Sequence, residues 1–323
     1  MGIGKPLISI LMAVYEPRMD WLREQLMSLN AQTYPNLRMY IRDDCSPTVP
    51  HEQIQSCVQD CITRFPYTIT RNEKNLGSNA TFELLTKEAE GDLFAYCDQD
   101  DVWLPEKLTV LQEAMERERA RLVCSDMYII DGDGKQVADS ITKVRRHHVF
   151  RSGRDLAEGL LTHNFVTGCT MLVQSDAAKH AIPFCPYMVH DHYIALCCAA
   201  EGMVYSSPER TIRYRIHGGN QTGIMSGVRD KESYLKVRIC AVEENLRWLE
   251  AHFPYSTDLS TSIQRHLLWA QARENNWKQK GHMSELWQMR DCGWQVTAYE
   301  ILAARLPEKL FMRTINLARK NVI

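Results

Sequence analysis

The chain has 323 residues, of which 45% are hydrophobic, and its formal net charge is -2. This length accommodates one large α/β domain or two smaller ones with a well-buried core. Because a near-zero net charge gives no electrostatic case for a nucleic-acid partner, we exclude that class.

The eleven cysteines are odd in number and lie mostly inside apolar runs, which favours buried thiols in a reducing compartment. Cys57 and Cys61 lack a nearby second pair of ligands, so we expect no structural zinc. The first residues carry no export signal, and no apolar run reaches about 18 residues. We therefore expect a cytoplasmic protein.

The N-terminal part predicts a strand–helix–strand unit. Residues 7–14 are almost continuously apolar, as in a strand covered on both faces of a parallel sheet. Apolar residues then recur at helical spacing over 21–29, and 37–41 supply the second strand. Asp43 and Asp44 follow it, at the edge where open α/β sheets bind ligands.

A polar, glycine-containing segment, residues 71–80, comes next. It follows a predicted helix over 52–64 and a strand over 67–70, and it opens a helix over about 78–90. The backbone N–H groups at that helix start are placed to face an anion.

The most informative stretch is the sequence Asp-Gln-Asp-Asp at 98–101, after the apolar run 93–97. A buried strand here delivers carboxylates to a sheet edge before Pro105 opens a helix. Carboxylates this close repel one another unless solvent or a cation neutralises them, and Mg²⁺ or Mn²⁺ is the usual partner. A solvated acidic turn is the alternative for so short a motif.

The later segments extend the α/β pattern to residue 224. We predict strands over 122–130 and 203–206, a loop over 164–173 that enters a strand, helices over 175–182 and 188–200, a hairpin turn at 131–134 and a solvated basic loop over 143–154. After that the pattern changes to long amphipathic helices. We therefore predict an α/β domain over 1–224 and a helical region over 225–323.

Four motifs in order resemble the family 2 glycosyltransferases with the GT-A fold. They are the apolar first strand, Asp-Asp-x-Ser after the second, Asn-Leu-Gly before a helix, and Asp-x-Asp-Asp-x-Trp after a later strand. Residues 167–169 (Thr-Gly-Cys) and 214–220 (Tyr-Arg-Ile-His-Gly-Gly-Asn) are most similar to the rhamnosyltransferase-type branch that builds bacterial surface polysaccharides. The resemblance implies a Rossmann-like, mixed or mostly parallel sheet flanked by helices.

The resemblance also implies roles for single residues. Those expected at the nucleotide are Ala13, Val14, Tyr15, Glu16, Asp43, Asp44, Asn75, Gly77, Ala80, Asp98 and Gln99. Those expected to hold a divalent metal, Mg²⁺ or Mn²⁺, at the diphosphate are Asp100, Asp101 and His217. Such an ion neutralises the charge that develops on a nucleoside diphosphate leaving group.

Asp191 is the residue that we expect to carry the chemistry. An inverting transfer needs a carboxylate to remove the proton of the acceptor hydroxyl, and Asp191 falls where this family places that base. The family commonly has Glu-Asp, whereas His190 precedes Asp191 here and His192 follows it. Either histidine could share the proton, and the alternative for each is a hydrogen-bonded structural role.

The expected activity is inverting transfer of a sugar, such as rhamnose from dTDP-rhamnose, in O-antigen or capsule synthesis. The donor would be linked to dTDP, UDP or GDP, and the acceptor would be a glycan or a lipid-linked oligosaccharide. A sugar-nucleotide pyrophosphorylase needs a glycine-rich loop where this chain has residues 13–17. A non-catalytic glycan-binding module has no reason to keep carboxylates that repel one another.

For residues 225–323 only the pattern is informative. Apolar residues between 235 and 249 recur at helical spacing and must bury a face. Packing onto the catalytic domain is one expectation, and a homo-oligomer is another. The basic amphipathic segment 302–323 suits an anionic membrane surface, so peripheral attachment to the inner face of the cytoplasmic membrane is a third.

Overall fold

The computed structural model describes residues 4–145, 147–218, 225, 227–253 and 258–319. The chain divides into two compact units, one made of residues 1–160 and 164–218 and the other of 161–163 and 219–323. Residues 219–224 lie outside the described residues, so Gly219, Asn220 and the predicted boundary at 224 do too. The same holds for Arg146 in the basic loop and for the last residues, 320–323.

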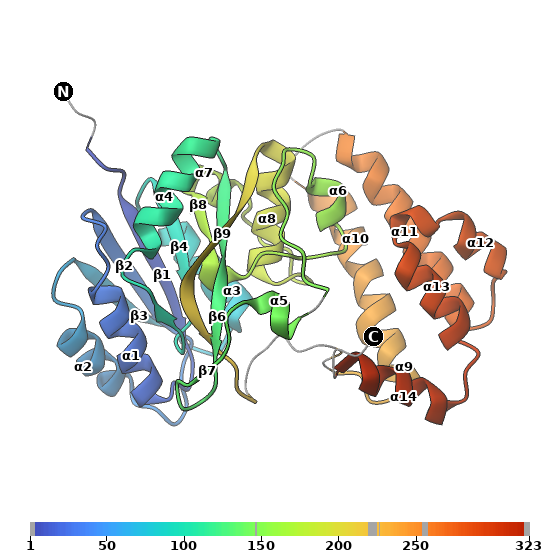
Figure 1. Cartoon of the computed structure of the whole chain (residues 1–323), viewed down its shortest axis with the longest axis horizontal. Helices are drawn as coiled ribbons and strands as arrows, with labels where there is room; N and C mark the ends of the chain where they lie inside the picture. The colour runs from blue at the N-terminus through green and yellow to red at the C-terminus, as the bar shows by residue number, and fades with distance from the viewer. Residues whose placement is uncertain (1–3, 146, 219–224, 226, 254–257, 320–323) are drawn as a thin grey trace. The chain divides into compact units, whose positions relative to one another are not determined.

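The first unit is built on a mixed sheet with helices on both sides (Figure 1). Its strands are β1 Ile8–Val14, β2 Leu37–Asp43, β3 Tyr67–Arg71, β4 Leu93–Cys97, β5 Val102–Trp103, β6 Leu122–Ile130, β7 Gln136–Ala138, β8 Leu172–Gln174 and β9 Val204–Arg215. Along the sheet their order is β3-β2-β1-β4-β8-β6-β9-β5, and β7 pairs with β6. The predicted fold class, an α/β sheet flanked by helices, is confirmed.

Strands β1 to β4 are parallel to one another, whereas β8 joins β4 and β6 in antiparallel pairs. The apolar runs of β1 and β4 are almost wholly buried, as expected for strands covered on both faces. In register, Val14 lies opposite Asp43 and Met12 opposite Cys97. The carboxyl ends of β1, β2 and β4 therefore meet at one edge.

Helices connect and cover these strands. They are α1 Met19–Asn30, α2 His51–Cys61, α3 Ser78–Glu88, α4 Lys107–Glu118, α5 Ile141–Val144, α6 Ala157–Leu160, α7 Ser175–His180, α8 His190–Glu201 and the 3-10 turn η1 Gly168–Thr170. α1 packs with α2, and α3 packs on β1 and β2. α4 packs on β6 and β9.

Two strands differ from the sequence prediction. We predicted a strand over 203–206, but β9 continues to Arg215. Pro208 normally argues against a strand, and here the pairing with β6 shifts register between Ser125 and Asp126 so that the proline is accommodated at a bulge. The two-residue β5 was missed because so short a strand has no periodicity to detect. The hairpin turn at 131–134 is confirmed, since β6 and β7 pair antiparallel around it.

The second unit is helical. It contains α9 Lys231–Tyr234, a π-helical turn η2 Leu235–Cys240, α10 Ala241–His252, α11 Asp258–Trp277, α12 Met283–Gln288, the 3-10 turn η3 Arg290–Cys292, α13 Trp294–Ala303 and α14 Glu308–Arg319. Tyr234, Trp277, Phe311 and Ile315 lie in its core. Among the described residues, no helix combines the length and the apolarity that a membrane crossing needs.

Candidate active site

The loop after β2 is tied together by two buried carboxylates. Asp43 accepts hydrogen bonds from the backbone N of Ser46 at 3.0 Å and from its hydroxyl at 2.7 Å, and its other oxygen faces His51 and Arg71. Asp44 accepts from Asn72, from Leu76 N at 2.8 Å and from Gly77 N at 2.8 Å. These two predicted nucleotide contacts shape the loops that border the site.

Gly77 directly precedes α3 and has a φ of +82°, a conformation that glycine adopts without steric cost. The side chain of Asn75 accepts a hydrogen bond from Gly77 N at 3.1 Å, which tightens the turn. Asn75 and Ala80 are exposed, so the predicted Asn-Leu-Gly segment presents small and polar groups to solvent beside the sheet edge.

Gln99 clamps the end of β1 to the acidic cluster. Its side-chain oxygen accepts from Tyr15 N at 2.8 Å, and its amide nitrogen donates to Tyr15 O at 3.0 Å. Tyr15 itself is exposed. Glu16 has a φ of +46°, and its carboxylate accepts from the backbone of Thr48 and Val49. Gln99 and Glu16 thus organise backbone next to Ala13 and Val14.

Asp98 and Asp101 converge with Cys169. One ligand atom from each of the three lies within 4.8 Å of the others. Burial, with the charges of Asp100 and Asp191, raises the pKa of Asp98 to about 7, and burial raises that of Asp101 well above its usual value. In the described part of the chain, Asp101 Oδ2 is buried without a hydrogen-bond partner.

Asp100 pairs with His217, and both lie outside the group of Asp98, Asp101 and Cys169. Asp100 Oδ2 and His217 Nε2 are 2.7 Å apart, although 117 positions separate them in the sequence. The buried Arg215 holds this corner together, because its Nε donates to Asp100 O at 2.7 Å and its backbone N donates to Asp101 Oδ1 at 2.9 Å. His217 also contacts the ring of Trp21.

Asp191 lies in the first turn of α8 and is fixed by two donors. Its Oδ1 accepts from Asn164 Nδ2 at 3.1 Å, and its Oδ2 accepts from Gly168 N at 2.8 Å. Burial raises the pKa of Asp191 to about 6, although these hydrogen bonds oppose the shift. A carboxylate with this pKa is a base near neutral pH.

The two histidines beside Asp191 have structural environments. His190 stacks on Phe82 at 4.1 Å and lies 5.3 Å from the ring of Tyr96, and burial lowers its pKa to about 3. His192 Nε2 lies 2.6 Å from the carbonyl oxygen of Leu160. This geometry favours the hydrogen-bonded structural alternative for His192. His190 packs against aromatic rings instead, and among the described residues its Nε2 is buried without a hydrogen-bond partner.

The turn η1 joins Asp191 to the acidic cluster. Gly168 has to be small, because a Cβ there would lie 2.8 Å from His190 Nε2. The carbonyl of Cys169 accepts from the buried Lys107, whose ammonium also lies 3.7 Å from the ring centre of Trp103. Sequence reasoning missed Lys107 and Asn164, since neither belongs to a recognised motif and each acts through a distant segment.

Known proteins resemble this chain in sequence and fold. The model of the family described as Glycosyl transferase family 2 matches residues 9–180. The chain belongs to glycosyltransferase family 2. A protein of Nostoc sp. described as an uncharacterized glycosyltransferase is 25% identical over 211 residues, 62% of each chain. Another, from Methanocaldococcus jannaschii, is 32% identical over 133 residues, 41% of this chain and 45% of the relative.

The chain therefore spans less than two thirds of the length of these two relatives. The crystal structure of residues 1–349 of S. aureus TarS in complex with UDP-GlcNAc matches with a TM-score of 0.58 at 16% identity, over 98% of this chain and 88% of that one. The same segment of TarS in complex with UDP matches with a TM-score of 0.54. This likeness of fold and the family match confirm the predicted GT-A-type glycosyltransferase domain. The rhamnosyltransferase-type branch stays a prediction.

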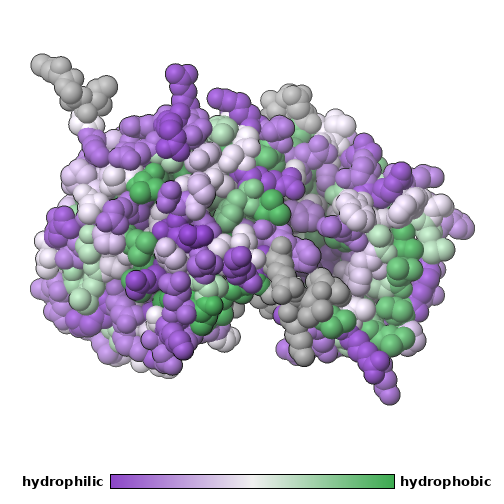
Figure 2. Space-filling view, viewed as in Figure 1, coloured by the Kyte–Doolittle hydropathy of each residue, from purple (hydrophilic) through white to green (hydrophobic). Residues whose placement is uncertain are grey.

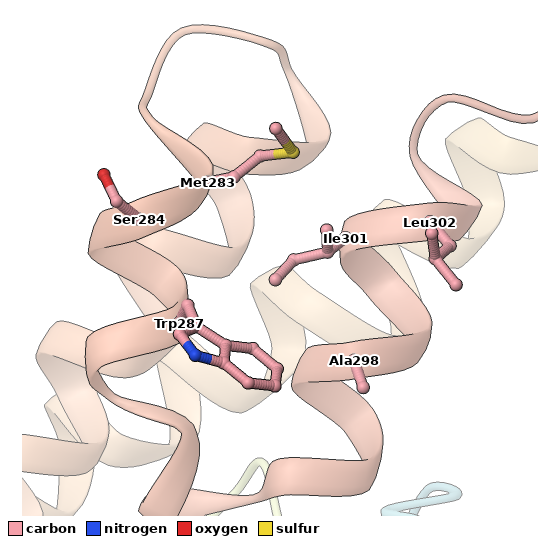
Figure 3. A pocket seen from close by; sticks show the side chains of 6 residues that line it. All are labelled: Met283, Ser284, Trp287, Ala298, Ile301 and Leu302. Atoms are coloured by element: carbon pink, nitrogen blue, oxygen red, sulfur yellow. The ribbon is translucent and has the colours of Figure 1, made fainter.

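A pocket of about 450 Å³ in the helical unit of this glycosyltransferase has a different character. It is lined by Met283, Ser284, Trp287, Ala298, Ile301 and Leu302. Figure 3 shows Trp287 and Ile301 pointing toward each other between α12 and α13. Because none of these side chains is charged, the pocket offers nothing to bind a diphosphate.

Proposed function

We propose that the chain is an inverting glycosyltransferase in which Asp191 removes the proton of the acceptor hydroxyl. One observation carries this proposal: Gly168 N donates to Asp191 Oδ2 at 2.8 Å, and the ligand atom of the next residue, Cys169, lies within 4.8 Å of those of Asp98 and Asp101. A base and a cluster suited to a diphosphate therefore share one site. Burial sets the pKa of Asp191 at about 6, where a carboxylate is both charged and basic at neutral pH.

The donor side of the proposal rests on the carboxyl ends of β1, β2 and β4. Tyr15, the loop carrying Asp44 and the turn at Gly77 border the nucleotide. Gln99 holds the Tyr15 backbone, and Asp44 holds the turn at Gly77. The UDP and UDP-GlcNAc complexes of TarS support a nucleotide-sugar donor. We favour dTDP-rhamnose from the motifs at 167–169 and 214–217. A thermal-shift panel of dTDP-, UDP- and GDP-sugars with Mn²⁺ identifies the donor, because a bound ligand raises the melting temperature.

Asp98, Asp100, Asp101 and His217 suit a hard divalent cation. Carboxylate oxygens and an imidazole are ligands for Mn²⁺, and carboxylates suit Mg²⁺. The unpartnered Oδ2 of Asp101 and the raised pKa of Asp98 fit a positive charge at this point. Burial raises the pKa of the Cys169 thiol well above its usual value, so we do not count this soft ligand in the set. When bound, the ion would neutralise charge on the leaving nucleoside diphosphate.

Asp100→Ala tests the metal role. Metal-dependent binding of the nucleotide sugar and release of nucleoside diphosphate should both be lost, whereas Asp133→Ala removes an exposed acid from the hairpin turn and should change neither. Full activity of the wild type in EDTA would refute the metal role and leave the base assignment intact.

We further propose a lipid-linked glycan acceptor and contact with an anionic membrane. Phe311 and Ile315 are buried in the helical core, which leaves Leu302, Leu310 and Leu317 of the predicted amphipathic segment exposed. Figure 2 shows hydrophobic side chains gathered over α13. Apolar side chains of this kind interleaved with basic ones suit an anionic lipid surface.

Leu302→Glu, combined with Leu310→Glu, tests this contact without disturbing the core. The double variant should co-sediment less than the wild type with vesicles that contain anionic lipid. Binding of the wild type should weaken as salt is added. Val137→Glu, at an exposed position of β7, is the matched control. Equal partitioning of all three proteins would favour self-association as the role of these side chains.

A further inference from the structure

Asn164 is held so that it presents only donors to Asp191. Its side-chain oxygen accepts a hydrogen bond from Val166 N at 2.9 Å, which orients the amide. Its Nδ2 then donates to Asp191 Oδ1 at 3.1 Å. An amide carries one oxygen and one NH₂ group, so the contact with Val166 determines which of them faces the carboxylate.

We propose that Asn164 is a positioning residue that keeps Asp191 charged and aimed at the acceptor hydroxyl. This inference rests on the proposed role of Asp191 as the base. A donor on each carboxylate oxygen, Asn164 on one and Gly168 on the other, prevents rotation of the carboxylate. Each oxygen keeps further lone-pair capacity for a substrate proton. Hydrogen bonds to the charged form also favour that form.

Other charged groups act on Asp191 as well. Arg145, just after α5, favours the charged form of Asp191, and the charge of Asp191 in turn raises the pKa of Asp98 at the end of β4. His190 on the same helix is neutral because burial lowers its pKa to about 3. These groups stay in place when Asn164 is replaced, so a change in the titration of Asp191 reports the contact with Asn164.

Two substitutions separate positioning from loop structure. Asn164→Asp keeps the shape of the side chain and the acceptor for Val166 N, but it places a negative charge next to Asp191. Asn164→Ala removes both hydrogen bonds. Positioning predicts that the acid limb of the kcat/KM profile moves up by about one pH unit in Asn164→Ala and further in Asn164→Asp. A purely structural role of the loop predicts that Asn164→Ala lowers kcat/KM without moving the acid limb of the profile.

The same titration is followed without turnover by the ¹³C shift of the Asp191 carboxyl between about pH 4 and 9. Asn36→Asp adds the same charge at the opposite, amino-terminal end of the strands and should leave the Asp191 titration unchanged. Unchanged Asp191 titration in both Asn164 variants would overturn this inference. Near-normal turnover of Asp191→Asn would instead overturn the proposed base, so the two failures are distinguishable.

Discussion

Replacing Asp191 by asparagine removes the proposed base while keeping its shape. Asparagine can still accept the hydrogen bond from Gly168 N, but it cannot take a proton, and its NH₂ group would then face the NH₂ group of Asn164. We expect nucleoside diphosphate release in the presence of acceptor to fall by about 10² to 10⁴-fold, the usual contribution of general base catalysis. Donor affinity should barely change.

The pKa of Asp191 predicts how stability responds to the same substitution. Burial raises this pKa from 3.8 to about 6, so the folded state holds its proton more tightly than the unfolded chain does. Charging Asp191 therefore costs native stability, and the cost is absent below about pH 4 and complete above about pH 6. Two pKa units correspond to at most about 3 kcal/mol, and partial exposure and the unfavourable contact with Asn164 reduce this.

Asp191→Asn should consequently be as stable as the wild type at pH 4 and more stable, by about 1 to 2 kcal/mol, at pH 8. Chemical denaturation at the two pH values measures the difference, and the donor thermal shift confirms an intact nucleotide site. In the wild type, transfer should decline about tenfold per pH unit below pH 6, because a protonated carboxyl is no base. Near-normal turnover in the variant, with loss in His190→Ala or His192→Ala instead, would refute this assignment.

Three further outcomes test other parts of the structure. Gln99→Ala removes both hydrogen bonds to the Tyr15 backbone, so the KM for the donor should rise about tenfold with no change in the metal requirement, and steady-state kinetics measure this. His217→Ala should weaken Mn²⁺ binding in calorimetry by about 10 to 100-fold, and unaltered affinity would remove His217 from the ligand set. Glu300→Ala leaves the buried Arg273 without its carboxylate partner. The free energy of unfolding of the helical unit, measured by urea denaturation, should therefore fall by about 3 to 5 kcal/mol, and a loss under 1 kcal/mol would contradict the pairing.

The helices and strands of the first unit were largely predictable, because each depends on a local pattern. The buried strand β4 follows from five consecutive apolar residues, and β6 was placed at Leu122–Ile130 from the same kind of signal. The second half of β9 was not predicted. Pro208 and the charged pair Glu209 and Arg210 interrupt the strand pattern, and pairing with β6 across the sheet carries the strand past them to Arg215.

The sequence alone determined which chemical groups reach the sheet edge, since carboxylates placed directly after apolar strands must emerge there. Only the tertiary structure decided how they are paired. His217 meets Asp100 across 117 positions, Gln99 clamps Tyr15 across 84, and Asn164 reaches Asp191 across 27. Burial in the folded chain also sets the pKa of Asp98 and Asp191, because desolvation depends on what surrounds a carboxylate and not on its neighbours in the sequence.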